Sequence, residues 1–566
     1  MKILTKFRKE ISEDSFLKIA QIIIGTFTVE LLLSTLLFFI GLSITWYFFF
    51  VSLAISIVIC NIINDGSVSV IEIIASIAII VAFSWFSGKI FDVSWDGNSY
   101  HKLAIGLLKN HWNPLKSLPS LELTEGAGVY SFGNTLWVET YCKSTWFWGA
   151  SIYAITGNIE TGKSYTMIAM LCAFFVVFYF MRKKEHNIFR SVVMASIAAF
   201  NPIAVQQMTS FYIDGFLHTM LIILVVSLLM LEDKDHFDSI SAASMVASSM
   251  IVCGNIKFTG LLYGGIFCIV YYLIDCYRFI RRDSEWVAKV LKESALYCCL
   301  AIATVVWAGC SVYLTNFIRH GSLTYPLTGE GKVDIMTANS PFADENHFKN
   351  LFLSLFSRVD IFTIASGKSP ELKIPFTFNM NEVSMMDLPD SRISGFGILF
   401  SGLLVVAIIC LVFCFAVGNN RQQKIIIAVN LIVCVALMFC IKESWWARYS
   451  PYIYFIILAA VYMMLCSKKK ITMFFVTMYC TMLLANNCTS LINFKFRFEN
   501  AKAIEAEFLE LKNAGMIEIC NREFEGVYFN FKDYNVFYRV NNDLVNEEGL
   551  NTTNYKGTVW RLFQNQ

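Results

Sequence analysis

Thirteen apolar runs, each about twenty residues long, constrain the fold of this 566-residue chain more than any other feature. A helical run of this length matches the thickness of the hydrocarbon core of a bilayer. Hydrophobic residues make up 56% of the chain and charged residues only 16%, which is unlike a soluble protein of this size. The sequence therefore predicts an all-α polytopic membrane protein. The predicted spans are 16–41, 44–63, 68–88, 163–182, 190–208, 215–232, 238–254, 260–280, 293–314, 394–417, 424–441, 451–466 and 471–490.

Lysine and arginine residues in the short loops give these spans an orientation. Four basic clusters all fall on one side of a thirteen-span arrangement, namely those at 2–9, 181–184, 278–282 and 468–470. Because short basic loops are retained in the cytoplasm, we predict a cytoplasmic N-terminus in the cell (cytoplasmic or inner) membrane. The C-terminus and three long segments then lie on the outer side. The predicted parts are two N-terminal spans (1–67), a seven-span module (68–314) with the outer loop 89–162, a second outer loop or lid (315–393), four C-terminal spans (394–490) and an exported domain (491–566).

Two patterns in the outer segments predict local structure. Tyr100, Leu103 and Leu107 recur at helical spacing, which is typical of a helix lying on the membrane surface. In the exported domain, apolar residues alternate from Val527 to Phe531 and again from Val536 to Val540. Alternation of this kind indicates strands, so we predict a small α/β domain.

Composition and motifs exclude several functions. A net charge of only +2 gives no field that would recruit nucleic acid. The segment 157–164 satisfies the P-loop pattern, but the helix after it is apolar on every face and the loop is predicted to lie outside the cell. We interpret this segment as the start of a span, with Gly157 ending the preceding helix and Glu160 near the beginning of the next.

Ionisable residues collect at the outer ends of different spans. A charged group near membrane depth is energetically unfavourable, so residues of this kind tend to mark functional sites. The foremost is Asp96, which follows the third span and has the position of a general base for an incoming hydroxyl. The other candidates are Asp92, Lys143, Asp214, Lys257, Arg319, His320, Tyr325 and Arg448. Each has a structural alternative: Asp96, Asp92 and Asp214 as helix or turn caps, Lys257 as a snorkelling lysine, His320 as a loop residue, and Arg448 as an interfacial anchor.

At these residues the sequence resembles the GT-C membrane glycosyltransferases, among them the aminoarabinose transferases and protein O-mannosyltransferases. The order of spans and outer loops over residues 68–450 carries the resemblance, together with short motifs. These motifs are Asp96-Gly97-Asn98-Ser99-Tyr100, Trp112-Asn113-Pro114, Lys143-Ser144-Thr145-Trp146, Asn201-Pro202, Tyr212-Ile213-Asp214-Gly215 and Trp445-Trp446-Ala447-Arg448-Tyr449. The family has a second acid after the aspartate, and this chain has Gly97 there. The prolines that follow the family's lysine are also absent.

The resemblance implies an inverting transferase that moves a sugar from a polyprenyl-phosphate donor to a glycan, lipid or protein acceptor. Asp96 would be the general base, and Arg448, with Lys257 and Lys143 as second choices, would bind the phosphate. Tyr100, His101 and Tyr325 are further substrate-binding candidates. Asp214 would orient the acceptor or, with His320, bind a divalent metal ion, whose requirement stays open.

Two other functions remain open from the sequence. A transporter or flippase would show inverted repeats, and we find no convincing repeat. A polysaccharide polymerase or ligase for lipid-linked sugars would rely on outer-loop arginines, for which the chain offers Arg319, Arg358 and Arg392.

Overall fold

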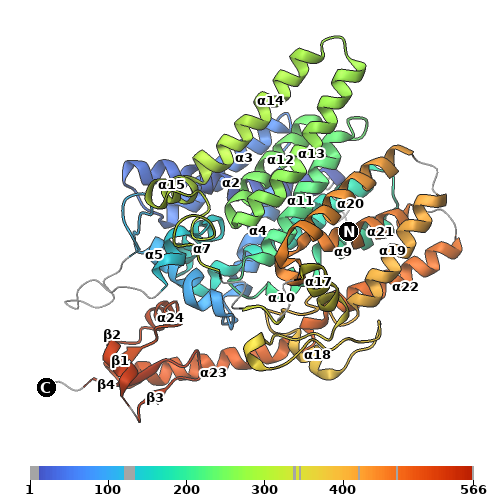
Figure 1. Ribbon diagram of the computed structural model, residues 1–566. Coiled ribbons are helices and arrows are strands. Elements are labelled where there is room, and N and C mark those ends of the chain that lie inside the picture. The colour runs from blue at the N-terminus through green and yellow to red at the C-terminus, as the bar shows by residue number, and fades with distance from the viewer. Residues whose placement is uncertain are drawn as a thin grey trace, which may run out of the picture.

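The chain folds into a helical bundle with a small sheet at its C-terminal end (Figure 1). The computed structural model describes residues 12–119, 134–334, 339–342, 346–417, 421–466, 470–547 and 549–563. The predicted basic clusters at 2–9 and 468–469, and residues 120–133 of the first outer loop, lie outside these ranges.

Ten helices within the described residues are long and apolar enough to cross a membrane, so this is an integral membrane protein. They are α2 (Glu13–Ile40), α3 (Trp46–Ile63), α4 (Val70–Ser87), α8 (Tyr165–Lys183), α11 (Asp214–Glu232), α12 (Ser239–Ile256), α13 (Phe258–Arg282), α14 (Trp286–Ile302), α19 (Phe400–Val417) and α20 (Arg421–Cys440). The other three predicted spans coincide with shorter or less apolar helices: α9 (Ile188–Ala199) with α10 (Pro202–Gln207), α21 (Pro451–Leu465) and α22 (Lys470–Asn487).

The predicted span 190–208 is wrong as a single helix, because the chain breaks at Asn201 and Pro202. α9 ends at Ala199, and the side-chain oxygen of Asn201 accepts the backbone N–H of Ala204 at 2.9 Å to cap α10. Proline lacks an N–H to continue the first helix but suits the first turn of a new one.

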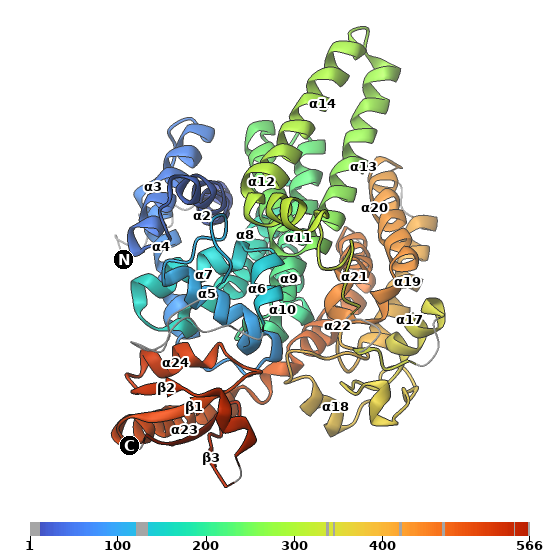
Figure 2. The same cartoon turned by 60° about the vertical axis from the view of Figure 1, so that its left-hand side comes forward.

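The two ends of the bundle differ in both views (Figures 1 and 2). The hairpin of α13 and α14, with Arg278 near its tip, projects at one end, and α18 (Met380–Met385), α23 (Phe494–Asn513) and the sheet lie at the other. Segments predicted to lie on opposite sides of the membrane are therefore at opposite ends of the bundle. The remaining helices are α5 (Lys102–Lys109), α6 (Thr135–Thr140), α7 (Ser144–Thr156), α15 (Thr315–His320), α17 (His347–Phe356) and α24 (Val527–Asp533).

The predicted surface helix is α5, and the structure corrects its environment. Leu103, Leu107 and Leu108 are fully buried, because α7 and α24 cover the helix. At Gly106 an added Cβ would lie 2.3 Å from the ring of Phe529, so the C-terminal domain packs directly on this helix. The apolar pattern is the same whether lipid or protein covers it.

The C-terminal domain pairs α23 with a four-stranded sheet of order β2-β1-β4-β3. The second predicted strand is confirmed in part as β2, but the alternating segment from Val527 to Phe531 is the helix α24. Its rings pack on α23 around the buried Phe508. The strands are β1 (Ile517–Cys520), β2 (Tyr538–Val540), β3 (Asn551–Thr552) and β4 (Val559–Leu562).

Candidate functional site

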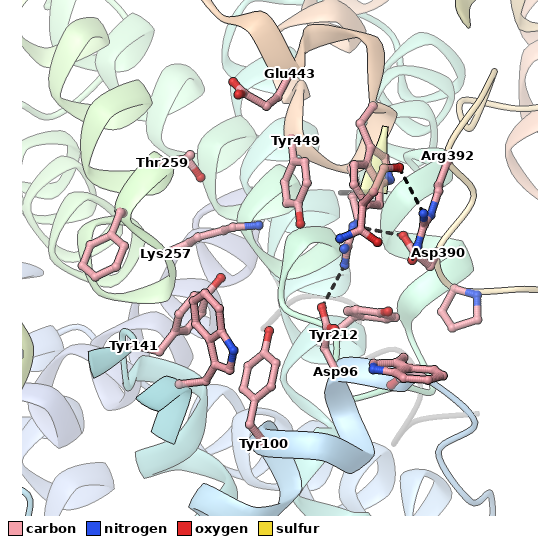
Figure 3. Close-up of a pocket in the computed structure, with 18 of the residues that line it drawn as sticks. Asp96, Tyr100, Tyr141, Tyr212, Lys257, Thr259, Asp390, Arg392, Glu443 and Tyr449 are labelled. Atoms are coloured by element: carbon pink, nitrogen blue, oxygen red, sulfur yellow. Dashed lines mark hydrogen bonds and ion pairs between the residues drawn. The ribbon is translucent and has the colours of Figure 1, made fainter. Parts of the chain in front are cut away.

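A cavity of about 900 Å³ lies where the helical bundle meets the C-terminal domain, whose Lys556 is one of the lining residues. Side chains from widely separated parts of the chain, between residues 93 and 556, converge on it (Figure 3). The polar and aromatic lining residues include Trp95, Asp96, Tyr100, Trp137, Tyr141, Tyr212, Lys257, Tyr263, Asp390, Arg392, Glu443, Trp446, Arg448, Tyr449 and Lys556.

Asp96 lies at the start of a π-helical turn, η1 (Gly97–His101), and faces the cavity. Its carboxylate makes no capping hydrogen bond, so the capping alternative is wrong. Its Oδ2 accepts an N–H from Arg448 Nη1 at 3.2 Å, and no described residue donates to Oδ1. One carboxylate oxygen is therefore available to a ligand in the cavity.

Asp92 is fully buried, and its carboxylate stabilises the backbone that leads into this turn. It accepts the backbone N–H and the hydroxyl of Ser94 at 2.8 and 2.7 Å, and the backbone N–H of Phe211 at 3.2 Å. A Cβ on Gly97 would lie 1.9 Å from Asp92 Oδ2. The second acid of the family motif therefore has no space in this chain.

Arg448 is the centre of the charged cluster, in the short turn η7 (Ala447–Tyr449) between α20 and α21. Its guanidinium is 3.2 Å from Asp96, 3.4 Å from Asp214 and 3.1 Å from Asp390. Burial alone would lower its pKa, but the surrounding carboxylates, Asp390 foremost, hold the pKa well above its ordinary value. The side chain is only 6% exposed, so Arg448 is no interfacial anchor.

Lys257 and Asp214 form a second ion pair beside Arg448. Lys257 Nζ donates to Asp214 Oδ1 at 2.8 Å and lies 3.6 Å from the ring centroid of Tyr449. Burial lowers the pKa of Lys257, and Asp214 opposes that shift. Lys257 points to a carboxylate and an aromatic face instead of snorkelling to water.

Asp390 was missed by the sequence analysis. It precedes α19, pairs with Arg448, and lies 3.5 Å from Arg392 Nη2. Burial raises its pKa, while the two arginines counter the shift. The rule that selected Asp96, an acid at the mouth of a predicted span, applies equally to Asp390 before 394–417.

Aromatic side chains form most of the remaining wall. The guanidinium of Arg448 lies 4.7, 4.6 and 4.7 Å from the ring centroids of Tyr212, Trp446 and Tyr449. Tyr100 and Tyr141 face the cavity from the opposite side (Figure 3). Such rings offer flat apolar faces with polar edges, a surface suited to a ligand that carries both hydroxyl groups and apolar C–H faces.

Two predicted substrate-binding residues are buried away from the cavity. His101 lies behind Tyr100, accepts an N–H from Trp146 at 2.8 Å, and is kept neutral because burial lowers its pKa to about 3. Lys143 donates to the backbone carbonyls of Glu139 and Tyr141, both at 2.8 Å, and burial lowers its pKa to about 7. Neither side chain lines the cavity.

The two candidates after the ninth span also lie apart from the cavity. The rings of His320 and Tyr325 stack at 4.0 Å, and His320 Nε2 is 3.5 Å from Glu139. Of the two candidate metal ligands, Asp214 is paired with Lys257 and Arg448, whereas His320 stacks on Tyr325. Within the described residues, no group of three His, Cys, Asp or Glu residues is placed to hold a metal ion.

In the P-loop-like segment, side chains of the protein itself occupy the space that a nucleotide phosphate would need. Gly157 ends α7 at φ 66°, as the sequence analysis expects. Lys163 and Lys102 donate to the two carboxylate oxygens of Glu160 at 2.5 and 2.6 Å, and all three side chains are buried. The site where a nucleotide phosphate would bind is thus an internal ion cluster.

No family model and no curated protein sequence matches this chain. Among solved structures, it is similar to ArnT from Cupriavidus metallidurans in the apo state (TM-score 0.36, 9% identity) and bound to undecaprenyl phosphate (TM-score 0.34, 10% identity). In both cases the match covers 86% of this chain and 96% of that chain. Similarity at this level assigns neither family nor function, which must be inferred from the side chains of the cavity.

Proposed function

We propose that this protein is an inverting glycosyltransferase of the GT-C type. It would transfer a sugar from a polyprenyl-phosphate donor to an acceptor hydroxyl at the outer face of the cytoplasmic membrane. The observation that carries the proposal is the meeting of Asp96, Arg448 and Lys257 at one cavity with aromatic walls. A membrane-embedded bundle gives the lipid tail of the donor an apolar environment beside that cavity.

Each bond change in the reaction has a group in the cavity to assist it. The acceptor oxygen attacks the anomeric carbon, and the carbon–oxygen bond to the phosphate breaks on the opposite face. Asp96 Oδ1 takes the hydroxyl proton, and polyprenyl phosphate leaves with the electron pair. A positioned base of this kind contributes about 10²- to 10⁴-fold to the rate.

Arg448 is the group best suited to the leaving phosphate. A guanidinium can donate two parallel N–H groups to phosphate oxygens, and this one is buried enough for the interaction to be strong. Its present partners are three carboxylates, and the two that accept hydrogen bonds from its side chain both accept from Nη1. Lys257, held over the ring of Tyr449, supplies a second positive charge nearby.

The proposal is tested with lipids extracted from cells that lack the protein, which would accumulate the donor. Purified protein in vesicles is given this extract and a crude acceptor fraction, and the lipids are followed by mass spectrometry. Wild type should consume one glycolipid and release polyprenyl phosphate, and Asp96→Asn should slow this at least 10²-fold. Asp65→Asn is the matched control, because it changes an exposed turn residue at φ 51° that asparagine also tolerates.

Full turnover by Asp96→Asn would remove the base assignment. Movement of intact glycolipid between leaflets, with no release of polyprenyl phosphate, would instead identify a flippase.

Arg392 favours a second candidate, a polymerase or ligase for lipid-linked sugars. Of the three outer-loop arginines named for that class, only Arg392 lines the cavity. Arg319 pairs with Glu139, and Arg358 pairs with Glu371 and Glu382. A product series with many added sugar units, instead of one, would select this candidate.

A further inference from the structure

The tip of the hairpin between β3 and β4 reaches the wall of the cavity. Lys556 at this tip lines the cavity, and it adopts φ 60° beside Gly557 at φ 62°. A non-glycine residue in the left-handed region is strained and persists only when surrounding contacts hold it. Such strain is often found where a side chain must be aimed at a particular place.

The C-terminal domain itself holds this conformation. Asn521 donates to the carbonyl of Lys556 at 3.0 Å, and Thr553 donates to the carbonyl of Tyr555 at 2.8 Å. The backbone N–H of Thr558 donates to the hydroxyl of Thr553 at 2.9 Å, closing the tip. The backbone of Lys556 is therefore held by contacts within its own domain.

From this tip, two side chains bind the backbone just before Asp96. Lys556 Nζ donates to the carbonyls of Val93 and Ser94 at 2.7 and 3.0 Å. The hydroxyl of Tyr555 lies 2.8 Å from the carbonyl of Asp92 and 2.9 Å from the side-chain oxygen of Asn98. Three consecutive carbonyls thus find partners on a domain more than 450 residues away in sequence.

The segment lies between α4 and the turn η1 and is not itself part of a regular helix or strand. Inside the bundle, Asn98 Nδ2 also donates to the carbonyls of Asp92 and Ser94, both at 2.8 Å, and Glu160 accepts the backbone N–H of Asp92 at 3.1 Å. The backbone order of the segment depends on the buried Asp92 and Glu160, on Asn98 and on the hairpin tip. An ammonium that bridges two carbonyls at once forms charge-assisted hydrogen bonds, which are stronger than neutral ones.

We propose that Lys556 is a positioning residue for Asp96, which makes the exported C-terminal domain part of the active site. The proposal rests on the transferase function proposed above for the cavity. Lys556 acts through the backbone of residues 93 and 94, so it sets where the carboxylate of Asp96 stands and takes no part in proton transfer.

Three variants test this role: Lys556→Met, Lys556→Arg and, as a matched control, Lys512→Met at an exposed lysine near the end of α23. Methionine and arginine share the strain of lysine at φ 60°, so the backbone cost cancels between them. The first measurement is hydrogen exchange of peptides covering 92–98, which needs no substrate. The second is kcat and donor KM in the lipid assay.

We expect Lys556→Met, which removes two charge-assisted hydrogen bonds, to speed exchange at 92–98 by at least about tenfold and to lower kcat about tenfold. Donor KM should stay within about twofold and the melting temperature should not change. Lys556→Arg should restore most of both, and Lys512→Met should match wild type.

Unchanged exchange at 92–98 in Lys556→Met would overturn the proposal. A higher KM at constant kcat would also overturn it, because Lys556 would then contact substrate instead. If wild type shows no transfer, the exchange measurement still decides whether the domain orders this segment.

Discussion

Replacing Arg448 with methionine should cost both stability and catalysis, and the structure sets the size of each effect. The guanidinium contacts Asp96, Asp214 and Asp390 within 3.4 Å. Removing one partner of a buried ion pair usually costs about 3–5 kcal/mol. Two features reduce that loss. The side chains of Asp96 and Asp390 are 25% and 23% exposed, and Asp214 keeps Lys257. We therefore expect the free energy of unfolding to fall by about 2 kcal/mol.

The catalytic loss should be larger than the loss of stability. Removing one group that stabilises charge in the transition state typically slows a reaction about 10²- to 10³-fold. Arg448→Lys keeps the positive charge but cannot reach three carboxylates or chelate a phosphate with a planar fork. Compared with Arg448→Met, the Arg448→Lys variant should therefore regain most of the stability of wild type but only a small part of its activity.

Thermal unfolding in detergent and donor consumption in vesicles measure the two effects separately. Unfolding is followed at two pH values, because the carboxylates left by Arg448→Met repel one another only while ionised. In the variant, the pKa of Asp390, which burial already raises in the wild type, should rise further without Arg448. The stability gap to wild type should then narrow as the pH falls through that pKa. If wild type and Arg448→Met were equally stable at neutral pH, or if their difference in stability grew in acid, Arg448 would not stabilise the protein by balancing these carboxylates.

Two further substitutions test the buried residues that pack around Asp96 and Tyr100. His101→Gln should make unfolding less sensitive to acid. Burial lowers the pKa of the folded histidine from its ordinary 6.5 to about 3. The wild-type protein therefore loses stability as the pH falls from 6.5 toward 3, by about 1.4 kcal/mol at one unit below 6.5. Equal pH dependence in the two proteins would show that His101 is not kept neutral. Gly97→Ala should lower the free energy of unfolding by about 2 kcal/mol, because its Cβ would lie 1.9 Å from Asp92 Oδ2. Gly265→Ala, where nothing lies within 4 Å of the new methyl group, is its control in the same melting assay, and equal melting of the two variants would exclude the clash.

The features that could be predicted from the sequence are those fixed by local length and charge. Apolar runs locate the helices, and ionisable residues at their ends identify Asp96, Lys257 and Arg448, which line the cavity, and Asp214, which pairs with Lys257 and Arg448. Periodicity does not identify what covers an apolar face, so α5 was assigned to lipid although protein buries it. The same limit applies to α24, where alternation along the chain did not prevent a helix.

The residues that sequence reasoning missed or misplaced depend on the path of the chain in space. Lys143 satisfies the same rule as Lys257, yet its ammonium turns back to the carbonyls of its own loop. Lys556 is far from any span, and only the docking of the C-terminal domain brings it to the cavity. Charge at the end of a span is therefore a guide to candidates, and tertiary contacts decide which of them face one another.

The sharing of Arg448 has a consequence for the proposed reaction. Before a donor binds, Asp96 is held by the guanidinium and its charge is balanced inside the cavity. A donor phosphate that takes over the N–H groups of Arg448 would free Asp96 Oδ2 and leave its carboxylate facing the acceptor hydroxyl. Asp96 Oδ1 faces the cavity with or without a donor, so binding of the donor changes the charge that surrounds the base and not its access to the acceptor. A cluster whose opposite charges are paired when the cavity is empty thus stabilises the buried charges of the site until a donor phosphate brings its own negative charge to Arg448.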